Sequence, residues 1–347
     1  MTNHLIALQR LARLSNNDTD ELDDDFVQFL IDELDQPASA VGRLSPLLLQ
    51  RLQQLERQPA ELLRRLQFSN AAVKQLHHLQ QQWLGKVVQA LMAENIAVVP
   101  LKAAAFNDRL YPPDTPRIGA DLDLLILEQD IDRAHHCIGQ MLTPVKVTHS
   151  KHAANAISCK SAWKLPQKIP CRLYLHHAIA PAELFPQLTQ QLFEHSQPYS
   201  DSPGALIRKL SVEDHLLYLA IQATRDLTVT NHNLLDAHEI WSQWEPDHYK
   251  LLKTARQTGS SNALFILLET CRRRLNTPVP ENWLRRLPQS HLRASIGTWA
   301  FEKGARYNRD AITTGYKVRQ LLGCALVPDK PGTITAVARD YLSPVRC

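Results

Sequence analysis

A chain of 347 residues with 44% hydrophobic residues, 21% charged residues and a net charge of +4 is long enough for two or three compact units. It has no apolar run of the roughly 18 residues that a membrane-spanning helix needs, and its acidic N-terminal segment lacks a signal-peptide core, so we expect a cytoplasmic protein without membrane contact. The six cysteines form no Cys-x-x-Cys pair, which argues against a zinc site or disulfides.

The charge is unevenly distributed along the chain. Residues 1–60 carry five Lys and Arg against ten Asp and Glu, whereas residues 251–347 carry sixteen against six. The basic segment can meet a nucleic acid or a triphosphate, dock against the acidic segment, or form a solvated helical face. One alternative function is therefore an RNA-binding helical protein that uses Arg272, Arg273, Arg274, Arg285 and Arg286.

Residues 21–95 are predicted to be helical. Apolar residues recur at helical spacing in three segments separated by prolines, 26–34, 47–58 and 60–68. Ser69 then has the side chain of a helix N-cap, so we expect a new and longer helix over 70–95.

In the centre of the chain the sequence pattern changes from helical spacing to short strands around one helix. Strands are predicted at 96–100 and 121–127, a helix at 128–142, and further strand candidates at 145–150, 155–160 and 171–179. This mixture indicates a small mixed sheet.

Helical spacing returns after residue 181. Helices are predicted over 211–226, 233–244, 248–257, 263–275 and from 291 onward. The predicted fold class is α/β (α+β), a small mixed sheet flanked by N-terminal helices and a C-terminal helical bundle. The predicted regions are 1–68 (N-terminal helices), 69–200 (α/β core), 201–325 (C-terminal bundle) and 326–347 (a loosely packed tail).

The strand at 121–127 carries the most informative side chains. Because side chains alternate between the two faces of a strand, Asp121 and Asp123 point the same way and Leu122 points the other. Paired carboxylates suit Mg²⁺ or Mn²⁺, and a two-metal site activates the attacking oxygen while neutralising the leaving group. The alternative is an edge strand with two solvated acids.

Two basic residues precede the acidic pair. Lys102 lies at a predicted strand-to-helix turn, where backbone N–H groups also favour a phosphate. Arg117 comes shortly before the acidic strand. Both are candidate ligands for a triphosphate.

These residues follow one another in a known order. A leucine–lysine turn, a Tyr-Pro turn, an arginine, a glycine and an acidic strand are formed by Leu101, Lys102, Tyr111, Pro112, Arg117, Gly119, Asp121, Asp123, Leu124 and Leu125. The order resembles the bacterial branch of the polymerase-β-like nucleotidyltransferase superfamily that is described as uncharacterised nucleotidyltransferase. The resemblance spans roughly residues 70–275, where later family features are matched by Leu175, His176, Glu213, Asp214 and Asp236.

The resemblance implies a nucleotidyltransferase-type sheet and an activity. Such an enzyme uses Mg²⁺ or Mn²⁺ to move a nucleoside monophosphate from a nucleoside triphosphate to an acceptor, here an unknown small molecule, protein or RNA. Asp121 and Asp123 would hold the metal and act in catalysis. The nucleotide site would include Lys102, Ala103, Arg117 and Tyr174.

Two positions depart from the family pattern. Ala103 stands where the family has glycine, whose missing side chain lets the backbone approach a triphosphate. Tyr174 stands where relatives carry a third carboxylate, so Tyr174→Asp is expected to raise the activity of a merely slow enzyme. The alternative function is a catalytically impaired fold that binds a ligand or a protein.

Two further residues have more than one interpretation. His176 shares a strand face with Arg172 and Tyr174, and it is either a catalytic general base or a hydrogen-bonded residue at a strand end. Asp236 either reaches the cleft from its helix or forms a salt bridge between helices.

Overall fold

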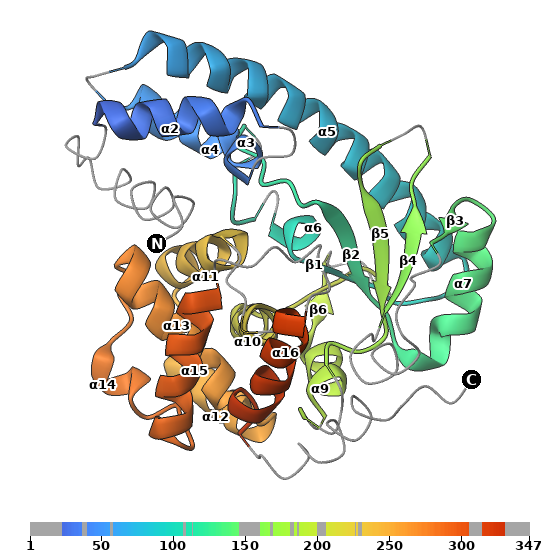
Figure 1. The fold of residues 1–347 in the computed structure, drawn as a ribbon. Coiled ribbons are helices and arrows are strands. Elements are labelled where there is room, and N and C mark those ends of the chain that lie inside the picture. The colour runs from blue at the N-terminus through green and yellow to red at the C-terminus, as the bar shows by residue number, and fades with distance from the viewer. Residues whose placement is uncertain are drawn as a thin grey trace.

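The computed structural model describes residues 23–329, apart from 37–39, 56–57, 107–108, 113, 146–159, 167–168, 181–183, 186, 200–205, 226, 228–230 and 305–313. Figure 1 shows a group of N-terminal helices, a sheet, and a C-terminal helical bundle, with one long helix running from the first group to the sheet. The expected α/β class with a small mixed sheet is confirmed.

The N-terminal helices are α2 (Asp24–Leu34), α3 (Ala40–Arg43), α4 (Ser45–Gln53) and the first half of α5 (Ala60–Ala93). Asp23 caps α2, because its side chain accepts a hydrogen bond of 2.7 Å from the backbone N–H of Phe26. Leu30, Leu52 and Leu62 are fully buried where these helices pack together. Their apolar spacing therefore forms a local core.

Helix α5 does not begin at Ser69, and that sequence prediction is wrong. The helix runs without interruption from Ala60 to Ala93. The Ser69 hydroxyl donates a hydrogen bond of 3.2 Å to the backbone carbonyl of Gly42, so it does not compete for the backbone of α5. One helix therefore serves two cores, since Leu62 packs with the N-terminal helices and Leu91 packs under the sheet.

The main sheet has five strands in the order β1-β2-β5-β4-β3. The strands are β1 (Val99–Leu101), β2 (Asp121–Leu125), β3 (Thr143–Pro144), β4 (Lys160–Lys164) and β5 (Arg172–His176). Strands β2 and β5 are parallel and the other neighbours are antiparallel. The predicted strands at 145–150 and 155–160 lie almost entirely outside the described residues.

The two faces of the sheet have different partners. Leu122, Leu124 and Leu173 pack against the second half of α5 and against α7 (Ile131–Gly139), which follows the short helix η2 (Glu128–Asp130). Apart from the buried Leu125, the alternate side chains of β2 and β5 are polar and lie on the opposite face. That polar face is the one that can carry chemistry.

The C-terminal helical region begins with α9, and the small hairpin of β6 (Gln197–Pro198) and β7 (Arg208–Lys209) separates α9 from the other helices. Its helices are α9 (Leu188–His195), α10 (Val212–Thr224), α11 (Asn231–Trp244), α12 (His248–Gln257), α13 (Ser261–Leu275), α14 (Glu281–Leu284), α15 (His291–Gly304) and α16 (Thr314–Leu326). Most side chains of α10 and α13 are buried, so these two helices form the centre of the bundle. Ser211 caps α10 by accepting a hydrogen bond from the backbone N–H of Asp214 at 3.2 Å.

The sequence analysis also predicted the absence of membrane-spanning helices and of disulfides. Among the described helices, none is long and apolar enough to cross a membrane. The cysteines within the described ranges are free thiols and are buried, namely Cys137, Cys171, Cys271 and Cys324. Cys159 and Cys347 lie outside the described residues.

His215 of α10 lies in an aromatic cluster at the junction of the bundle with α6 (Ala103–Phe106). Its ring centroid is 5.2 Å from that of Phe106 and 5.6 Å from that of Trp244. Neither ring nitrogen has a hydrogen-bond partner among the described residues. Burial, helped by the nearby Arg109, lowers the pKa of His215 to about 3.

We predict that His215→Phe makes the protein less sensitive to acid. The folded state keeps His215 neutral, so its contribution is intact above the unfolded pKa near 6.5 and is lost as the pH falls toward 3. The difference in free energy of unfolding between the variant and the wild type should shift in favour of the variant as the pH falls below 6.5. The shift should be up to about 1.4 kcal/mol per pH unit. Urea unfolding between pH 7 and pH 4.5 measures this difference.

His136→Gln is the control, because His136 is exposed on α7. Its unfolding curves should follow those of the wild type at each pH. Parallel pH profiles for His215→Phe and the wild type would contradict the prediction.

Candidate active site between the sheet and the helical bundle

A polar cavity of about 240 Å³ lies between the sheet and the bundle. Strands and loops of the α/β core contribute Lys102, Arg117, Ile118, Gly119, Ala120, Asp121, Asp123, Lys160 and Tyr174. The helical regions contribute Arg43, Gln222, Arg225, His232 and Asn233. The cavity therefore joins the sequence-predicted acidic pair to residues that come from all three parts of the fold.

Asp121 and Asp123 lie on the same face of β2 and both border this cavity. Asp121 is half-buried, whereas only 2% of Asp123 is exposed. The alternation that the sequence predicts is therefore present, and the two carboxylates differ in depth.

Asp123 is held by two partners. The Lys102 ammonium lies 3.0 Å from its Oδ2, and Nε2 of His176 lies 2.7 Å from its Oδ1. Burial alone would raise the pKa of Asp123, but Lys102, His176 and Lys160 outweigh burial and bring the pKa well below its ordinary value. Asp123 is therefore a fixed, ionised carboxylate.

Asp121 has the opposite electrostatic balance. Burial and the negative charge of Asp123 raise its pKa, and Lys102 and Lys160 offset this only in part. Asp121 is thus the less readily ionised of the two, and a divalent cation between two adjacent carboxylates would relieve their mutual repulsion. In the part of the chain that is described, no group of three or more His, Cys, Asp and Glu side chains is arranged for a metal.

His176 lies behind Asp123. It is 4% exposed, and burial lowers its pKa to about 4, against the opposing effect of Asp123. A neutral imidazole at this distance donates its Nε2–H to the carboxylate. The geometry matches the interpretation of a hydrogen-bonded residue at a strand end, with its proton directed at Asp123.

Lys102 occupies an unusual backbone conformation in the turn after β1. Its φ is 51°, in the left-handed region that residues other than glycine rarely adopt. The conformation places its ammonium against Asp123. Backbone strain at a functional position is common where neighbouring contacts enforce it.

Ala103 is buried and its methyl group faces Gly119. A Cβ atom at Gly119 would lie 3.3 Å from the Ala103 Cβ and only 2.8 Å from the backbone oxygen of Asp121. The segment that leads into β2 therefore passes so close to its neighbours that position 119 requires glycine. Ala103 contacts this segment from the first turn of α6.

Arg117 forms a buried ion pair with Asp236 of α11. Its Nε and Nη2 donate to the two carboxylate oxygens at 3.1 and 2.6 Å, and the Tyr111 hydroxyl donates to Oδ1 at 2.8 Å. This geometry matches the salt-bridge interpretation of Asp236. Arg117 also borders the cavity, so it anchors the loop before β2 at the wall of the site.

Tyr174 lies on β5 beside the acidic pair, with Lys160 of the adjacent strand above its ring. The Lys160 ammonium is 3.5 Å from the ring centroid, which is a close cation–π contact. Burial lowers the pKa of Lys160 to about 8, although Asp123 and Asp121 oppose the change. The position at which the resemblance in sequence led us to expect a third acid therefore holds an aromatic ring, with a cation above it.

The bundle supplies the opposite wall of the cavity. Arg225 follows the last residue of α10, and His232 lies in the first turn of α11. The Arg225 Nε and the His232 Nε2 are buried without a hydrogen-bond partner among the described residues. Donors of this kind are suited to an anionic ligand, because leaving them unsatisfied is costly.

Sequence analysis did not find Lys160, Arg225, His232 or the other polar wall residues. They belong to no motif, and they come from elements that are far apart in the sequence. Of these, Arg225 had a weak signal, as a cation near the end of the helix predicted over 211–226.

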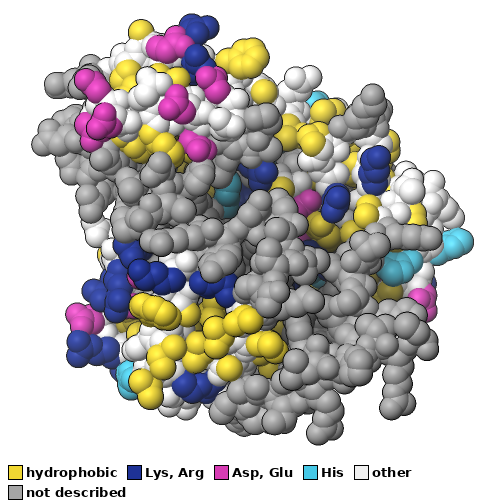
Figure 2. Space-filling model, viewed as in Figure 1, with side chains coloured by type: hydrophobic (Ala, Val, Ile, Leu, Met, Phe, Trp, Pro, Cys, Tyr) yellow, Lys and Arg dark blue, Asp and Glu magenta, His cyan; other side chains and the backbone are white. Residues whose placement is uncertain are grey.

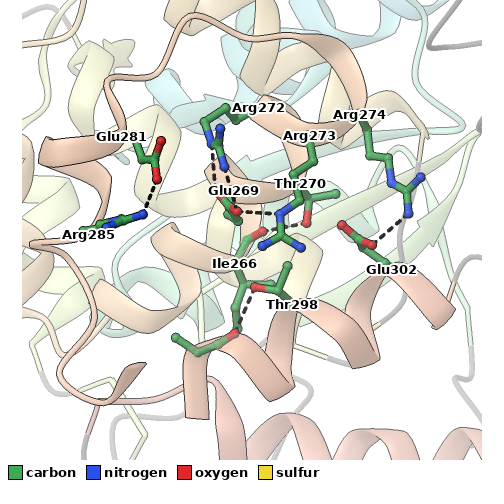
Figure 3. Close-up of polar contacts among 11 residues, drawn as sticks. Ile266, Glu269, Thr270, Arg272, Arg273, Arg274, Glu281, Arg285, Thr298 and Glu302 are labelled. Carbon is green, nitrogen blue, oxygen red and sulfur yellow. Dashed lines mark hydrogen bonds and ion pairs between the residues drawn. The ribbon is translucent and has the colours of Figure 1, made fainter. Parts of the chain in front are cut away.

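The arginines of the C-terminal helices lie elsewhere. Figure 2 shows Lys and Arg side chains gathered beside α13 and α14, and Asp and Glu side chains over the N-terminal helices. Figure 3 shows that Glu269 binds Arg272 and Arg273, that Glu302 binds Arg274, and that Glu281 binds Arg285. Because carboxylates of α13, α14 and α15 already engage the guanidinium groups of Arg272, Arg273, Arg274 and Arg285, the geometry offers little support for the RNA-binding alternative.

One family model, described as uncharacterised nucleotidyltransferase, matches residues 36–276, more than two thirds of the chain. The match begins well before residue 70, where the resemblance in sequence motifs began, so it includes α4 and all of α5. A comparison with curated proteins and one with solved structures gave no match.

We predict that neutralising the two carboxylates has different effects on stability. Asp123→Asn removes the charge that Lys102 and His176 engage in a buried place, so it should cost roughly 2–4 kcal/mol. Asp121→Asn relieves repulsion, so its free energy of unfolding should stay within about 1 kcal/mol of the wild type or exceed it. Urea unfolding without divalent cations measures both, and equal losses would contradict this assignment of partners.

We also predict that Gly119→Ala destabilises the protein by roughly 1–3 kcal/mol, because the new methyl group would contact backbone at 2.8 Å. Gly85→Ala is the matched control. Gly85 lies inside α5 with open space around its Cβ position, so alanine should stabilise by about 0.5–1 kcal/mol. The melting temperature should thus fall for Gly119→Ala and rise for Gly85→Ala. A Gly119→Ala protein as stable as the wild type would contradict the close contact of position 119 with the Asp121 backbone oxygen.

Proposed function

Because the chain belongs to the uncharacterised nucleotidyltransferase family, we propose that it transfers a nucleoside monophosphate from a nucleoside triphosphate to an acceptor, with Mg²⁺ or Mn²⁺ at Asp121 and Asp123. The observation that carries the proposal is the cavity itself. Two adjacent carboxylates border it on one strand, and cationic side chains surround them.

The proposed transfer balances as one displacement at phosphorus. An acceptor oxygen attacks the α-phosphorus, and a new phosphorus–oxygen bond forms. The bond from the α-phosphorus to the bridging oxygen breaks, and pyrophosphate leaves with the electron pair. The acceptor's proton passes to water. A divalent cation at the acidic pair supplies the positive charge that stabilises the phosphate oxygens during this step.

The chain's own residues prepare the acidic pair for this role. Lys102 and His176 fix the position of Asp123, so one carboxylate is oriented before any ligand arrives. Asp121 has the higher pKa and is the more exposed of the two carboxylates. A cation that enters the cavity would therefore reach Asp121 directly. Neutral His176 acts here as a positioning residue for Asp123.

The opposite wall is suited to the phosphates of the nucleotide. Arg225 and His232 present unsatisfied buried donors, and Arg43 borders the same cavity. Arg117 contributes its charge to the wall while its guanidinium holds Asp236. The fixed guanidinium groups of this wall would bind a polyphosphate without reorganisation.

A second candidate function is a catalytically impaired member of the fold that binds an anionic ligand. The observation in its favour is the pair of Tyr174 and Lys160 at the third-acid position. Both candidates place an anionic ligand in the same cavity. They differ in whether the α-phosphorus is attacked.

Transfer of label tests the proposal. The purified protein is incubated with each α-labelled nucleoside triphosphate, Mg²⁺ or Mn²⁺, and cell extract. We expect label on an acceptor and release of pyrophosphate, and we expect both to fall below detection in Asp121→Asn, which should remain folded.

His136→Gln is the active control, since His136 is exposed and remote from the cavity lining. Nucleotide bound without any transfer would favour the impaired-fold candidate. Undiminished transfer in Asp121→Asn would remove the acidic pair from the site.

A further inference from the structure

The helical bundle exposes an apolar stripe on α15 and α16. Leu292, Ile296 and Trp299 follow one another at spacings of four and three residues, so they lie on one face of α15, and they are 73%, 43% and 64% exposed. Val318 and Leu322 lie one turn apart on α16, which contacts α15, and both are exposed. Figure 2 shows hydrophobic side chains gathered over this part of the bundle. A gathered apolar surface of this kind marks an interaction site, whereas exposed apolar residues that are scattered singly do not.

A basic cavity adjoins the stripe. It has a volume of about 530 Å³ and lies between α13, α14 and α15, where Ser295, one turn before Trp299, is one of its lining residues. Its walls carry three arginines against two glutamates, namely Arg272, Arg273, Arg285, Glu269 and Glu281. The two glutamates engage all three arginines (Figure 3), so one positive charge remains in excess. A partner on this surface therefore needs an apolar face with an acidic border.

Helix α2 has this complementary pattern. Val27, Ile31 and Leu34 repeat at the same spacings of four and three residues, and each is only half-buried. The exposed surface next to them carries aspartates, and α2 contains no Lys or Arg. These aspartates are Asp24, Asp25, Asp32 and Asp35. An amphipathic helix with an acidic border is thus present in this chain itself.

Helix α2 does not meet the stripe of its own chain. Figure 1 shows α2 with the N-terminal helices and α15 in the bundle, well separated from each other. Figure 2 shows, from one side of the molecule, the acidic side chains over the N-terminal helices and the apolar and basic side chains over the bundle. A two-fold axis through that side can bring α2 of each copy to α15 of the other, which closes the assembly as a dimer.

An anionic membrane matches this surface less well. Surfaces that bind membranes combine apolar side chains with Lys and Arg that face the lipid headgroups. Here Glu269 and Glu281 line the same cavity as the arginines, and the surface is hollowed beside the stripe. Carboxylates in a hollow suit a protein partner with its own side chains to insert.

We propose that the protein forms a two-fold dimer in which α2 of each copy packs along the α15 stripe of the other. The apolar side chains of both helices bury one another, and the aspartates of α2 face the arginines of α13 and α14. The contact gives the uneven charge of the chain a role between copies.

Sedimentation velocity of the full chain over a concentration series tests the inference. We expect a dimer whose dissociation constant rises when NaCl is raised from about 0.05 M to about 0.5 M, because salt screens exposed charges. Trp299→Glu should weaken the dimer on the order of 30-fold, as expected for a central aromatic anchor. Met92→Glu is the matched control, since Met92 is an exposed apolar residue on the part of α5 that packs under the sheet, and it should leave the dissociation constant unchanged.

A mixing experiment tests the reciprocal arrangement. The double variant Asp25→Lys with Asp32→Lys, at two exposed positions of α2, should also lose most of its dimer, because lysines would face the arginines. Mixed with the Trp299→Glu protein, it should regain association. Each mixed pair has one intact contact, between α15 of the double variant and α2 of the Trp299→Glu chain.

Every other outcome overturns the inference. A wild-type chain that stays monomeric up to about 100 μM would assign the stripe to another occupant, including a membrane if that monomer cosediments with phosphatidylserine vesicles. A dimer weakened by Trp299→Glu but not by the aspartate variant would mean that two stripes pack on each other. Variants that do not associate when mixed would exclude the reciprocal contact. Circular dichroism confirms that each variant is folded, and Leu292→Glu replaces Trp299→Glu if the latter is not.

Discussion

The arrangement of the cavity depends on the buried ion pair between Arg117 and Asp236. Their side chains are 5% and 0% exposed, and two charges this deep are costly unless each finds partners. The Arg117 guanidinium donates hydrogen bonds to both carboxylate oxygens of Asp236, and the Tyr111 hydroxyl donates to one of them. The hydrogen-bonding needs of the buried carboxylate are therefore satisfied. Because Arg117 precedes β2 and Asp236 lies on α11, the pair joins the strand that bears the acids to the helix that forms the opposite wall. Weakening it would separate the two sides of the site.

Two carboxylates only two residues apart have unlike environments. Asp123 is deep and satisfied by Lys102 and His176, whereas Asp121 is shallower and bears the repulsion of its neighbour. The Asp123 carboxylate is therefore held in position before a cation binds. The Asp121 carboxylate would be freed of its repulsion with Asp123 when a cation binds. Preorganisation of the first reduces the entropy that a cation must overcome, and the unrelieved charge of the second provides the attraction.

The cations around the acids do not act alike. Lys102 and Arg117 are engaged by carboxylates, so their charges mainly support the structure of the site. Lys160 lies over the Tyr174 ring at the border of the cavity, and the Arg225 Nε is a buried donor without a partner among the described residues. An anionic ligand is favoured in either case, whether the protein transfers a nucleotide or only binds one. Tyr174 and Lys160 therefore make one wall of the cavity aromatic and cationic beside the acidic pair.

Local periodicity determined much of this protein from the sequence alone. Helices such as α12 and the alternation of Asp121 with Leu122 follow from backbone geometry, which depends on near neighbours. The motif from Lys102 to Asp123 was sufficient to indicate the family. Ser69 was misjudged because the carbonyl that engages its hydroxyl belongs to Gly42, in another helix. Only the tertiary structure placed Lys160 and Arg225 at the acids and made Asp123 unlike Asp121, because charge and burial depend on distances in space that the order of residues does not contain.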